Sequence, residues 1–368
     1  MLAIYSNNYF TDSVISHCNF SCPNEIFRSI DQYVNSDATV KLAFVNHLDQ
    51  FHVFESEHAR SEAIKNGTKF SQDIQQLQSC SQAVFAFDNE FHAYHCDIFK
   101  ANCQSNIHWV IPIHSTPLTD NTQMNILPWN VQFMYQVSSY RKVLLHKLDE
   151  IQQGVKKSFY FDALLGLTRS FREFVFHAVI NSKHQEKIFL TYGKLAQEEQ
   201  TFKYQWEPEV EFLQPFHSSA DYVNYLGENI KLSLIVPITL YNKCAYSIIT
   251  ETNAFNNYSF FTEKIARPLL AKRLFVVFSG YNYLKNLRKL GFQTFGNVID
   301  ESYDDIIDDQ QRWAEAFQQV ERLCDMEQTS VYQQIQPILE HNYQLFTTTD
   351  WNQLMIDQIK HVVNNLLH

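Results

Sequence analysis

The stretch of residues 245–280 restricts the possible folds of this chain more than any other part of the sequence. An apolar segment ends at Glu251, a polar loop follows, and the stretch closes with the second apolar segment LFVVFSG. Between them, the tripeptide Thr-Glu-Lys at residues 262–264 opens a segment with helical character. A strand, a helix and a second strand in this order predict a βαβ unit, and therefore a parallel sheet.

The side chains at the start of this helix suit a ligand that carries both a phosphate and a ribose. Thr262 can cap the helix, whose first backbone N–H groups and dipole favour an anion in front of it. Lys264 adds a positive charge at the same end, and Glu263 can accept two hydrogen bonds from a vicinal diol. We therefore expect a ribose diphosphate at this position.

A second helix start, upstream in the chain, also carries positive charge. Residues 158–166 predict a strand that runs into a turn, and Ser170 with Glu173 fits a capping box for the helix that follows. Arg169 lies just outside this cap, and Arg172 lies on the edge of the apolar stripe. Two arginines at this place suit an anion site, and the alternative is a pair of solvated arginines on an exposed turn.

Further strands and helices are predicted along the whole chain. In the first half, continuous apolar runs are typical of buried parallel strands: LAIY, VKLAFV, FHVF, AVFAFD and IHWVIPI. Helices are predicted at residues 24–35, 73–78, 137–151, 220–226 and 281–290, and again beyond residue 306. The alternation of strands and helices across residues 158–290 is typical of a doubly wound parallel sheet.

We therefore predict an α/β protein with two domains, an α/β layer in the first half and a doubly wound parallel sheet in the second. Of the eight glycines, only Gly67 precedes residue 152, and this shift in composition marks the boundary. The predicted domains are residues 1–152 and 153–310, with C-terminal helices at residues 311–368 that pack back across both.

Charge and hydropathy limit the possible partners. The formal net charge of -11 disfavours nucleic acid as a partner, because a phosphate backbone is repelled unless one face of the protein is locally basic. No apolar run has the length of a membrane span, and MLAIYSNNYF lacks the features of a signal peptide. We expect a soluble, cytoplasmic protein.

The sequence predicts neither a metal site nor a bound cofactor. Its seven cysteines are scattered, and no C-x-x-C knuckle recurs at the spacing of zinc ligands. The D-x-D triplet that would hold a divalent ion on a diphosphate is absent, as is the G-x-x-x-x-G-K-[ST] loop of GTPases and many kinases. Protein cations would then have to neutralise the diphosphate.

Three segments together carry a resemblance to a known family. They are FDALLGLTRSFREFVF, FFTEK between an apolar strand ending in Glu251 and one ending in Gly280, and LRKLGFQTFGNVIDESYDDI. Over roughly residues 159–312, the chain resembles the donor-binding half of fucosyltransferase-like glycosyltransferases. It is still more similar to related glycosyltransferases of bacteria and phages.

The resemblance implies a hexosyl- or fucosyltransferase-like enzyme with the two-domain GT-B fold, in which two Rossmann-like domains face a cleft. It would move a sugar, without a metal, from a nucleoside-diphosphate sugar to a hydroxyl of a glycan, a protein or another compound. Residues 153–310 would bind the donor, and residues 1–152 would form the acceptor side.

The resemblance also assigns roles to single residues. Glu263 would bind the ribose, Lys264 and Arg172 would neutralise the diphosphate, and Glu251 would face the donor sugar. Phe260 stands where the fucosyltransferases have a tyrosine, and it would stack on the base. Pro268 lies inside the predicted helix, which must therefore bend or be short.

A general base for the acceptor hydroxyl is expected from the first half of the chain. Glu90 is the first candidate and Asp88 the second, because both follow the predicted strand AVFAF. The alternative for both is a solvated, acidic helix start.

Two other functions stay open. One is a glycosyltransferase that acts on modified DNA bases, and the other is a catalytically silent nucleotide-sugar-binding protein. The sequence leaves the sugar, the nucleotide, the acceptor, the stereochemical outcome and the oligomeric state open.

Overall fold

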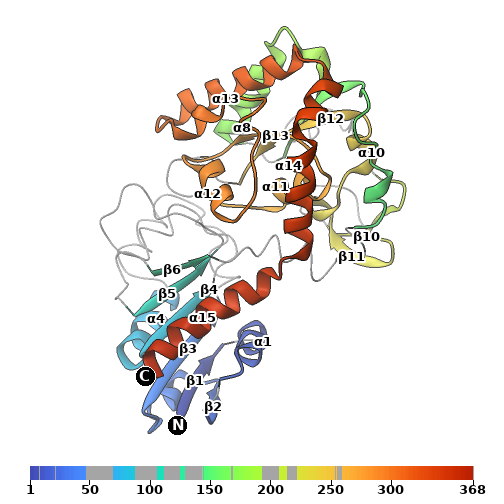
Figure 1. The fold of residues 1–368 in the computed structure, drawn as a ribbon. Helices are drawn as coiled ribbons and strands as arrows, with labels where there is room; N and C mark the ends of the chain where they lie inside the picture. The colour runs from blue at the N-terminus through green and yellow to red at the C-terminus, as the bar shows by residue number, and fades with distance from the viewer. Residues whose placement is uncertain are drawn as a thin grey trace. The chain divides into compact units, whose positions relative to one another are not determined.

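In the computed structural model, the described residues are 1–7, 9–20, 22–46, 69–87, 106–111, 125–128, 143, 145–166, 169–192, 207–213, 222–252, 254 and 259–367. The chain divides into two compact units (Figure 1). Unit 1 consists of Met1–Val131 and Asp350–His368, and unit 2 consists of Gln132–Thr349. Among the described residues, no helix has the length and hydrophobicity that a membrane span requires.

Unit 1 contains a six-stranded parallel sheet with the order β2-β1-β3-β4-β5-β6. All residues of β1 and β4 are buried, as expected for strands that are covered on both faces. The apolar runs that predicted β1, β3, β4 and β5 are thus confirmed, and FHVF lies outside the described residues. The strands are β1 (Leu2–Ser6), β2 (Asn24–Phe27), β3 (Val40–Asn46), β4 (Ala83–Phe87), β5 (Ile107–Ile111) and β6 (Asn125–Pro128).

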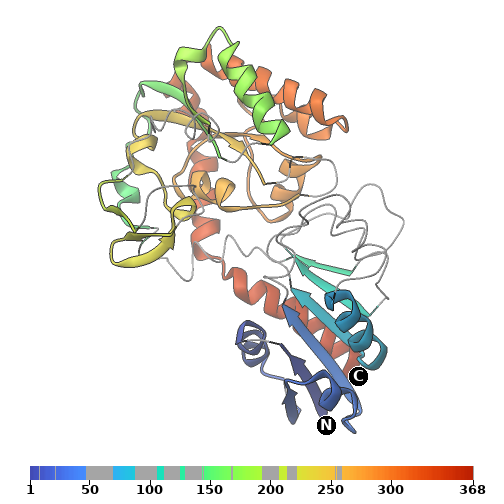
Figure 2. The ribbon, with the colours of Figure 1, turned by 180° about the vertical axis from the view of Figure 1, so that it is seen from behind.

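Helices cover both faces of this sheet (Figures 1 and 2). On one face, α1 (Tyr9–Cys18) contacts α15 (Trp351–Leu367), and on the other, α2 (Ile30–Val34) contacts α4 (Lys69–Cys80). The helix predicted at residues 73–78 is confirmed as part of α4. The single helix predicted at residues 24–35 is wrong, because its first residues pair with β1 as the edge strand β2.

Unit 2 contains a four-stranded parallel sheet with the order β13-β12-β7-β8. Ile248 of β12 lies between Ala163 of β7 and Val276 of β13, so β12 is a central strand. The βαβ unit predicted at residues 245–280 is confirmed. The strands are β7 (Phe159–Leu165), β8 (Ile188–Tyr192), β12 (Cys244–Thr250) and β13 (Phe275–Phe278).

Helices also lie on both sides of the second sheet (Figures 1 and 2). On one side, α8 (Ser170–Ile180) contacts α13 (Asp309–Cys324), and on the other, α11 (Glu263–Leu270) contacts α14 (Gln328–Thr348). The other helices in the described part of unit 2 are α10 (Ile238–Tyr241) and α12 (Tyr283–Lys289), with short 3-10 turns at Leu148–Glu150, Gln185–Lys187, Leu232–Leu234 and Glu301–Asp305. The prediction of an α/β fold with parallel sheets is therefore confirmed.

A small antiparallel sheet in unit 2 corrects the helix that was predicted at residues 220–226. Its strands are β9 (Val210–Phe212), β10 (Tyr222–Tyr225) and β11 (Glu228–Lys231). Leu226 and Gly227 connect β10 and β11 with φ angles of 55° and 84°. Positive φ at both positions defines a type I′ hairpin turn, which Leu-Gly signals more weakly than Asn-Gly does.

Helices were also predicted at residues 137–151 and beyond residue 306. Residues 137–142 and 144 lie outside the described residues, and the described end contains the 3-10 turn Leu148–Glu150. Beyond residue 306, α13, α14 and α15 are all present. The first two belong to unit 2, whereas α15 belongs to unit 1.

Candidate functional site

The candidate site lies at the carboxyl ends of β7 and β12, where the strand order of unit 2 reverses. From β7 the chain passes through α8 to β8 on one side, whereas β12 lies on the other side of β7 and leads through α11 to β13. The chain therefore passes from β7 and from β12 toward opposite edges of the sheet. In open α/β sheets, ligands bind in the crevice at such a reversal.

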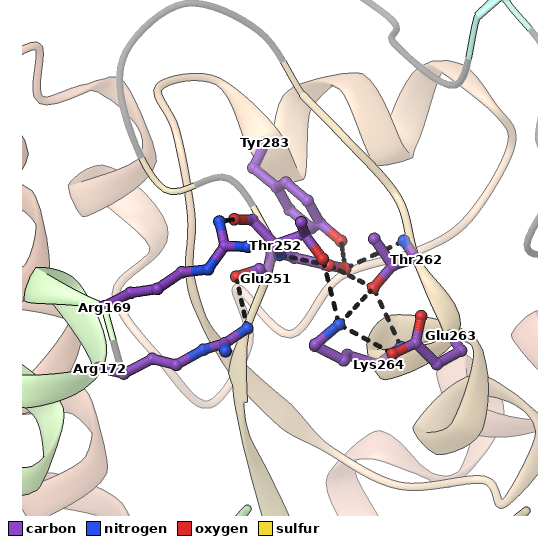
Figure 3. A network of polar contacts seen from close by, with 8 residues as sticks. All are labelled: Arg169, Arg172, Glu251, Thr252, Thr262, Glu263, Lys264 and Tyr283. Carbon is purple, nitrogen blue, oxygen red and sulfur yellow. Dashed lines mark hydrogen bonds and ion pairs between the residues drawn. The ribbon is translucent and has the colours of Figure 1, made fainter. Parts of the chain in front are cut away.

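A buried carboxylate forms the centre of the site. Glu251 follows the last residue of β12, and its side chain has no solvent exposure. Its Oε1 accepts hydrogen bonds from the Tyr283 hydroxyl at 2.7 Å and from the Thr262 backbone N–H at 3.3 Å. Its Oε2 accepts from the Thr262 hydroxyl at 2.5 Å and from the Thr252 N–H at 3.3 Å (Figure 3). These four donors compensate for the burial of the charge.

The start of α11 is organised around Thr262. As predicted, Thr262 is the N-cap of α11, and its hydroxyl oxygen accepts the Lys264 N–H at 3.2 Å. The Lys264 Nζ lies 2.8 Å from a Glu263 carboxylate oxygen and 3.2 Å from the Thr252 hydroxyl. The side chains of Glu263 and Lys264 are 14% and 20% exposed, so this pair lies at the border between the site and solvent.

Both arginines of α8 point to the end of β12 (Figure 3). The Arg169 guanidinium donates to the Thr252 carbonyl at 2.8 Å, and that of Arg172 donates to the Glu251 carbonyl at 3.4 Å. Arg172 is only 5% exposed, which overturns the alternative of two solvated arginines on an exposed turn. The structure thus brings Arg169, Arg172 and Lys264 together around one strand end.

The capping box predicted at Ser170 and Glu173 is wrong. The N-cap of α8 is Arg169, with the extended angles φ -149° and ψ 149°, and Ser170 is already the first helical residue. The helix therefore begins one residue earlier than the pattern indicated. As a result, Arg169 is fixed at the helix start instead of lying outside it.

The pKa values of the site follow from burial and from the opposing charges. Burial and the neighbouring Arg169 lower the pKa of Arg172 to about 10, so the guanidinium stays charged at neutral pH. Burial raises the pKa of Glu251, against the opposing effects of Lys264, Thr262 and Tyr283. Burial also acts on Glu263, but the charges of Lys264 and Arg267 outweigh it and hold the pKa of Glu263 below its ordinary value.

Two of the residues predicted to contact a ligand are closed off in this structure. Phe260 is 1% exposed, so its ring offers no open face on which a base could stack. The Glu251 carboxylate is fully buried, and its oxygens accept hydrogen bonds from protein groups. Glu251 therefore holds the site together in this structure, and its contact with a donor sugar stays a prediction.

The predicted general bases, Asp88 and Glu90, lie outside the described residues. Two residues of the network were not predicted from the sequence, namely Thr252 and Tyr283. Each follows the carboxyl end of a strand of unit 2, β12 and β13 respectively. Position after a buried strand is therefore the signal that could have identified them.

In the part of the chain that the structure describes, no three His, Cys, Asp or Glu side chains are grouped so that they could hold a metal ion. The described candidate site instead offers three cationic side chains beside hydroxyl and carbonyl groups. This arrangement can bind an anion, and Glu263 can add a hydrogen-bond acceptor at its border.

Comparisons with known proteins do not assign the chain to a family. No family model, no curated protein and no solved structure matches it. The resemblance to fucosyltransferase-like glycosyltransferases therefore stays a prediction.

Proposed function

We propose that the protein is a nucleotide-sugar-dependent glycosyltransferase whose donor binds at the candidate site of unit 2. In this proposal, the two units take the roles of the two domains of a GT-B enzyme, and unit 1 supplies the acceptor side. The reaction transfers a sugar from a nucleoside diphosphate to an acceptor hydroxyl, and protein cations take the place of a metal ion.

One observation carries the proposal. Three cations from two different helix starts, Arg169 and Arg172 of α8 and Lys264 of α11, converge on the reversal point of a parallel sheet. Three positive charges, of Arg169, Arg172 and Lys264, face two carboxylates, Glu251 and Glu263, so the site has an excess of positive charge that an anion can neutralise. A diphosphate fits both the charge and the position.

The same cations would assist the chemical step. When the bond between the anomeric carbon and the diphosphate oxygen breaks, negative charge develops on the leaving diphosphate. Fixed guanidinium and ammonium groups stabilise this charge without having to reorganise. Within the described residues, the Arg169 guanidinium makes one hydrogen bond, to the Thr252 carbonyl, and a guanidinium has five N–H donors, so it retains donors for an oxyanion.

Glu263 and Lys264 would act as a pair that opens on binding. In the free protein, the Lys264 ammonium lies 2.8 Å from a Glu263 carboxylate oxygen. A diphosphate can take over the ammonium group, which releases the Glu263 carboxylate to accept hydrogen bonds from the ribose diol. Glu90 or Asp88 remains the proposed base for the acceptor hydroxyl.

The proposal is tested by a thermal-shift panel with GDP, UDP, ADP and CDP, each with and without an attached sugar. A ligand that binds only the folded protein raises the melting temperature. We expect one nucleotide to produce a clear shift, and Lys264→Ala to weaken its affinity by about 10- to 100-fold, as loss of a charge-assisted hydrogen bond does. Arg172→Ala should have an effect of the same size.

The matched control is Lys183→Ala, which removes an exposed lysine of unit 2 that pairs with Asp325. It should leave the shift unchanged. If no nucleoside diphosphate binds, or if Lys264→Ala and Arg172→Ala both retain full affinity, the proposed site is wrong. Binding without donor hydrolysis or transfer would instead indicate the silent nucleotide-sugar-binding protein.

A further inference from the structure

We infer that Tyr283 is a positioning residue for the cationic site: through Glu251 and Thr262, it fixes where Lys264 holds its ammonium group. The ligand in this inference rests on the proposed function. The positioning itself is a property of the free protein, and it can be measured without any ligand. Figure 3 shows the chain of contacts from Tyr283 to Lys264.

The direction of each hydrogen bond follows from which groups can only donate. The Thr262 hydroxyl oxygen accepts the Lys264 backbone N–H at 3.2 Å and faces the Lys264 Nζ at 3.4 Å. Both Lys264 groups are donors only, so the hydrogen of the Thr262 hydroxyl must point to the Glu251 Oε2, 2.5 Å away. Lys264 is thus oriented by a threonine whose own proton is committed to Glu251.

The other contacts of Glu251 show why Tyr283 matters. The backbone N–H groups of Thr252 and Thr262 can only donate, and both are long at 3.3 Å. The Thr262 hydroxyl oxygen already faces two donors of Lys264. The Tyr283 hydroxyl is therefore the group that could change from donor to acceptor if Glu251 gained a proton. While Tyr283 donates at 2.7 Å, it favours the ionised carboxylate that the Thr262 hydroxyl requires.

Tyr283 itself is held firmly. Its side chain is buried, and its ring contacts Phe261 edge-on with centroids 4.8 Å apart. Tyr283 is the first residue of α12, and the Asp304 carboxylate accepts the next two backbone N–H groups, of Leu284 and Lys285, at 2.9 Å each. The backbone at Tyr283 is therefore fixed by Asp304, and its ring is fixed by burial, so the hydroxyl has a defined position.

Removal of the hydroxyl should loosen the whole chain of contacts. In Tyr283→Phe, Oε1 of Glu251 keeps only the long contact from the Thr262 N–H. The carboxylate is then free to rotate or to take up a proton, and the Thr262 hydroxyl loses its oriented acceptor. Lys264 should in turn leave its position beside Thr252 and Thr262 for part of the time.

The experiment measures how fast Lys264 is acetylated by acetic anhydride in the intact protein, without nucleotide, using mass spectrometry and the exposed Lys183 as internal standard. We expect Tyr283→Phe to raise the Lys264 rate by about fivefold, the population change that loss of one hydrogen bond typically gives. The matched control is Tyr246→Phe in β12, because the buried Tyr246 hydroxyl has no hydrogen-bond partner within the described residues. It should leave the rate unchanged.

Two variants of Thr262 test the same chain of contacts if the Tyr283→Phe protein does not fold. Thr262→Ser keeps the hydroxyl and should keep the wild-type rate, whereas Thr262→Val should raise it as Tyr283→Phe does. An unchanged Lys264 rate in Tyr283→Phe, or in Thr262→Val if only that variant folds, overturns the inference. So does an equal increase in the Tyr246→Phe control.

Nucleotide binding separates this inference from the proposed function. If the wild-type protein binds no nucleoside diphosphate while the acetylation rates change as expected, the proposed function fails and the positioning role stands. If the protein does bind one, Tyr283→Phe should weaken its affinity, by a smaller factor than it raises the Lys264 rate, because affinity follows the fraction that holds Lys264 in place and the rate follows the fraction that does not. Full affinity in Tyr283→Phe overturns the role of Tyr283 in the site.

Discussion

Three buried carboxylates show how single residues organise unit 2, and each is compensated in a different way. Asp162 forms an ion pair with Arg273, whose Nη2 lies 2.6 Å away, and also accepts the Ser247 hydroxyl. Glu251 is surrounded by hydroxyl and N–H donors, and Asp304 accepts two N–H groups at the start of α12. Each of these carboxylates would destabilise the fold if it were left without its partners, and each instead fixes one local arrangement.

Asp304 makes the stability of the protein depend on pH. Burial raises the pKa of Asp304 to about 6, so the folded protein binds this proton more tightly than the unfolded chain does. Its contribution is therefore present at low pH and is lost as the pH rises through about 6. The stability of the wild type relative to Asp304→Asn should fall by about 2 to 3 kcal/mol between pH 4 and pH 7, measured by urea unfolding.

The neighbouring Asp305 provides a second test of this prediction. The charge of Asp305 helps to raise the pKa of Asp304, so Asp305→Asn should move the pH dependence that Asp304 causes to lower pH. A wild-type to Asp304→Asn difference that is flat between pH 4 and pH 7 would contradict the prediction.

At the scale of helices and strands, the sequence predicted those elements whose formation depends on residues that are close in the sequence. The strands β1, β4, β12 and β13 were predicted because each is a short, continuous apolar run, and α11 was predicted from its threonine cap. The edge strand β2 and the hairpin of β10 and β11 were missed, because their pairing depends on partners and on a Leu-Gly turn. Local pattern carries no information about such tertiary partners.

The same limit applies to the candidate site. Arg169, Arg172 and Lys264 were predicted because each lies at a helix start in the sequence. The contact between Tyr283 and Glu251 was not predicted, because it joins α12 to the end of β12 through a side chain. Burial of Phe260 and Glu251 was missed for the same reason.

The end of α12 gives a prediction at the scale of one element. Gly291 follows this helix with φ at +94°, and a Cβ there would lie 3.3 Å from a Leu345 methyl group. Gly291→Ala should therefore lower the free energy of unfolding by about 1 to 2 kcal/mol, measured by urea unfolding, because L-residues are strained at positive φ.

Gly296, in the loop that follows, is the matched control. Its φ lies outside the left-handed region, and an added Cβ would meet nothing closer than Glu301 Oε2 at 3.5 Å. Gly296→Ala should change the stability by less than about 0.5 kcal/mol. Equal losses in both variants would show that the backbone conformation of Gly291 is not what requires glycine.

At the scale of the whole molecule, two units are built by the same rule from separate parts of the chain. In each parallel sheet, the second strand in the sequence pairs with one side of the first strand, and the later strands are added on its other side. Unit 1 is completed by α15 from the far end of the chain, because Asp350–His368 groups with Met1–Val131. A sequence pattern can identify α15 as an amphipathic helix, but not the sheet against which it packs.

The last prediction tests whether unit 1 depends on α15. Ile359 has no solvent exposure, and α15 contacts α1 and β6 of the same unit. Ile359→Asp places an unpaired charge in this interface, which should destabilise unit 1 by about 3 to 5 kcal/mol. Limited proteolysis followed by mass spectrometry should then show faster cleavage within Met1–Val131, with cleavage within Gln132–Thr349 unchanged.

Asn364→Asp adds the same charge at an exposed position of α15 and should behave as the wild type does. Equal acceleration of cleavage in both units would mean that they unfold together, and unchanged cleavage in Ile359→Asp would mean that α15 does not hold unit 1.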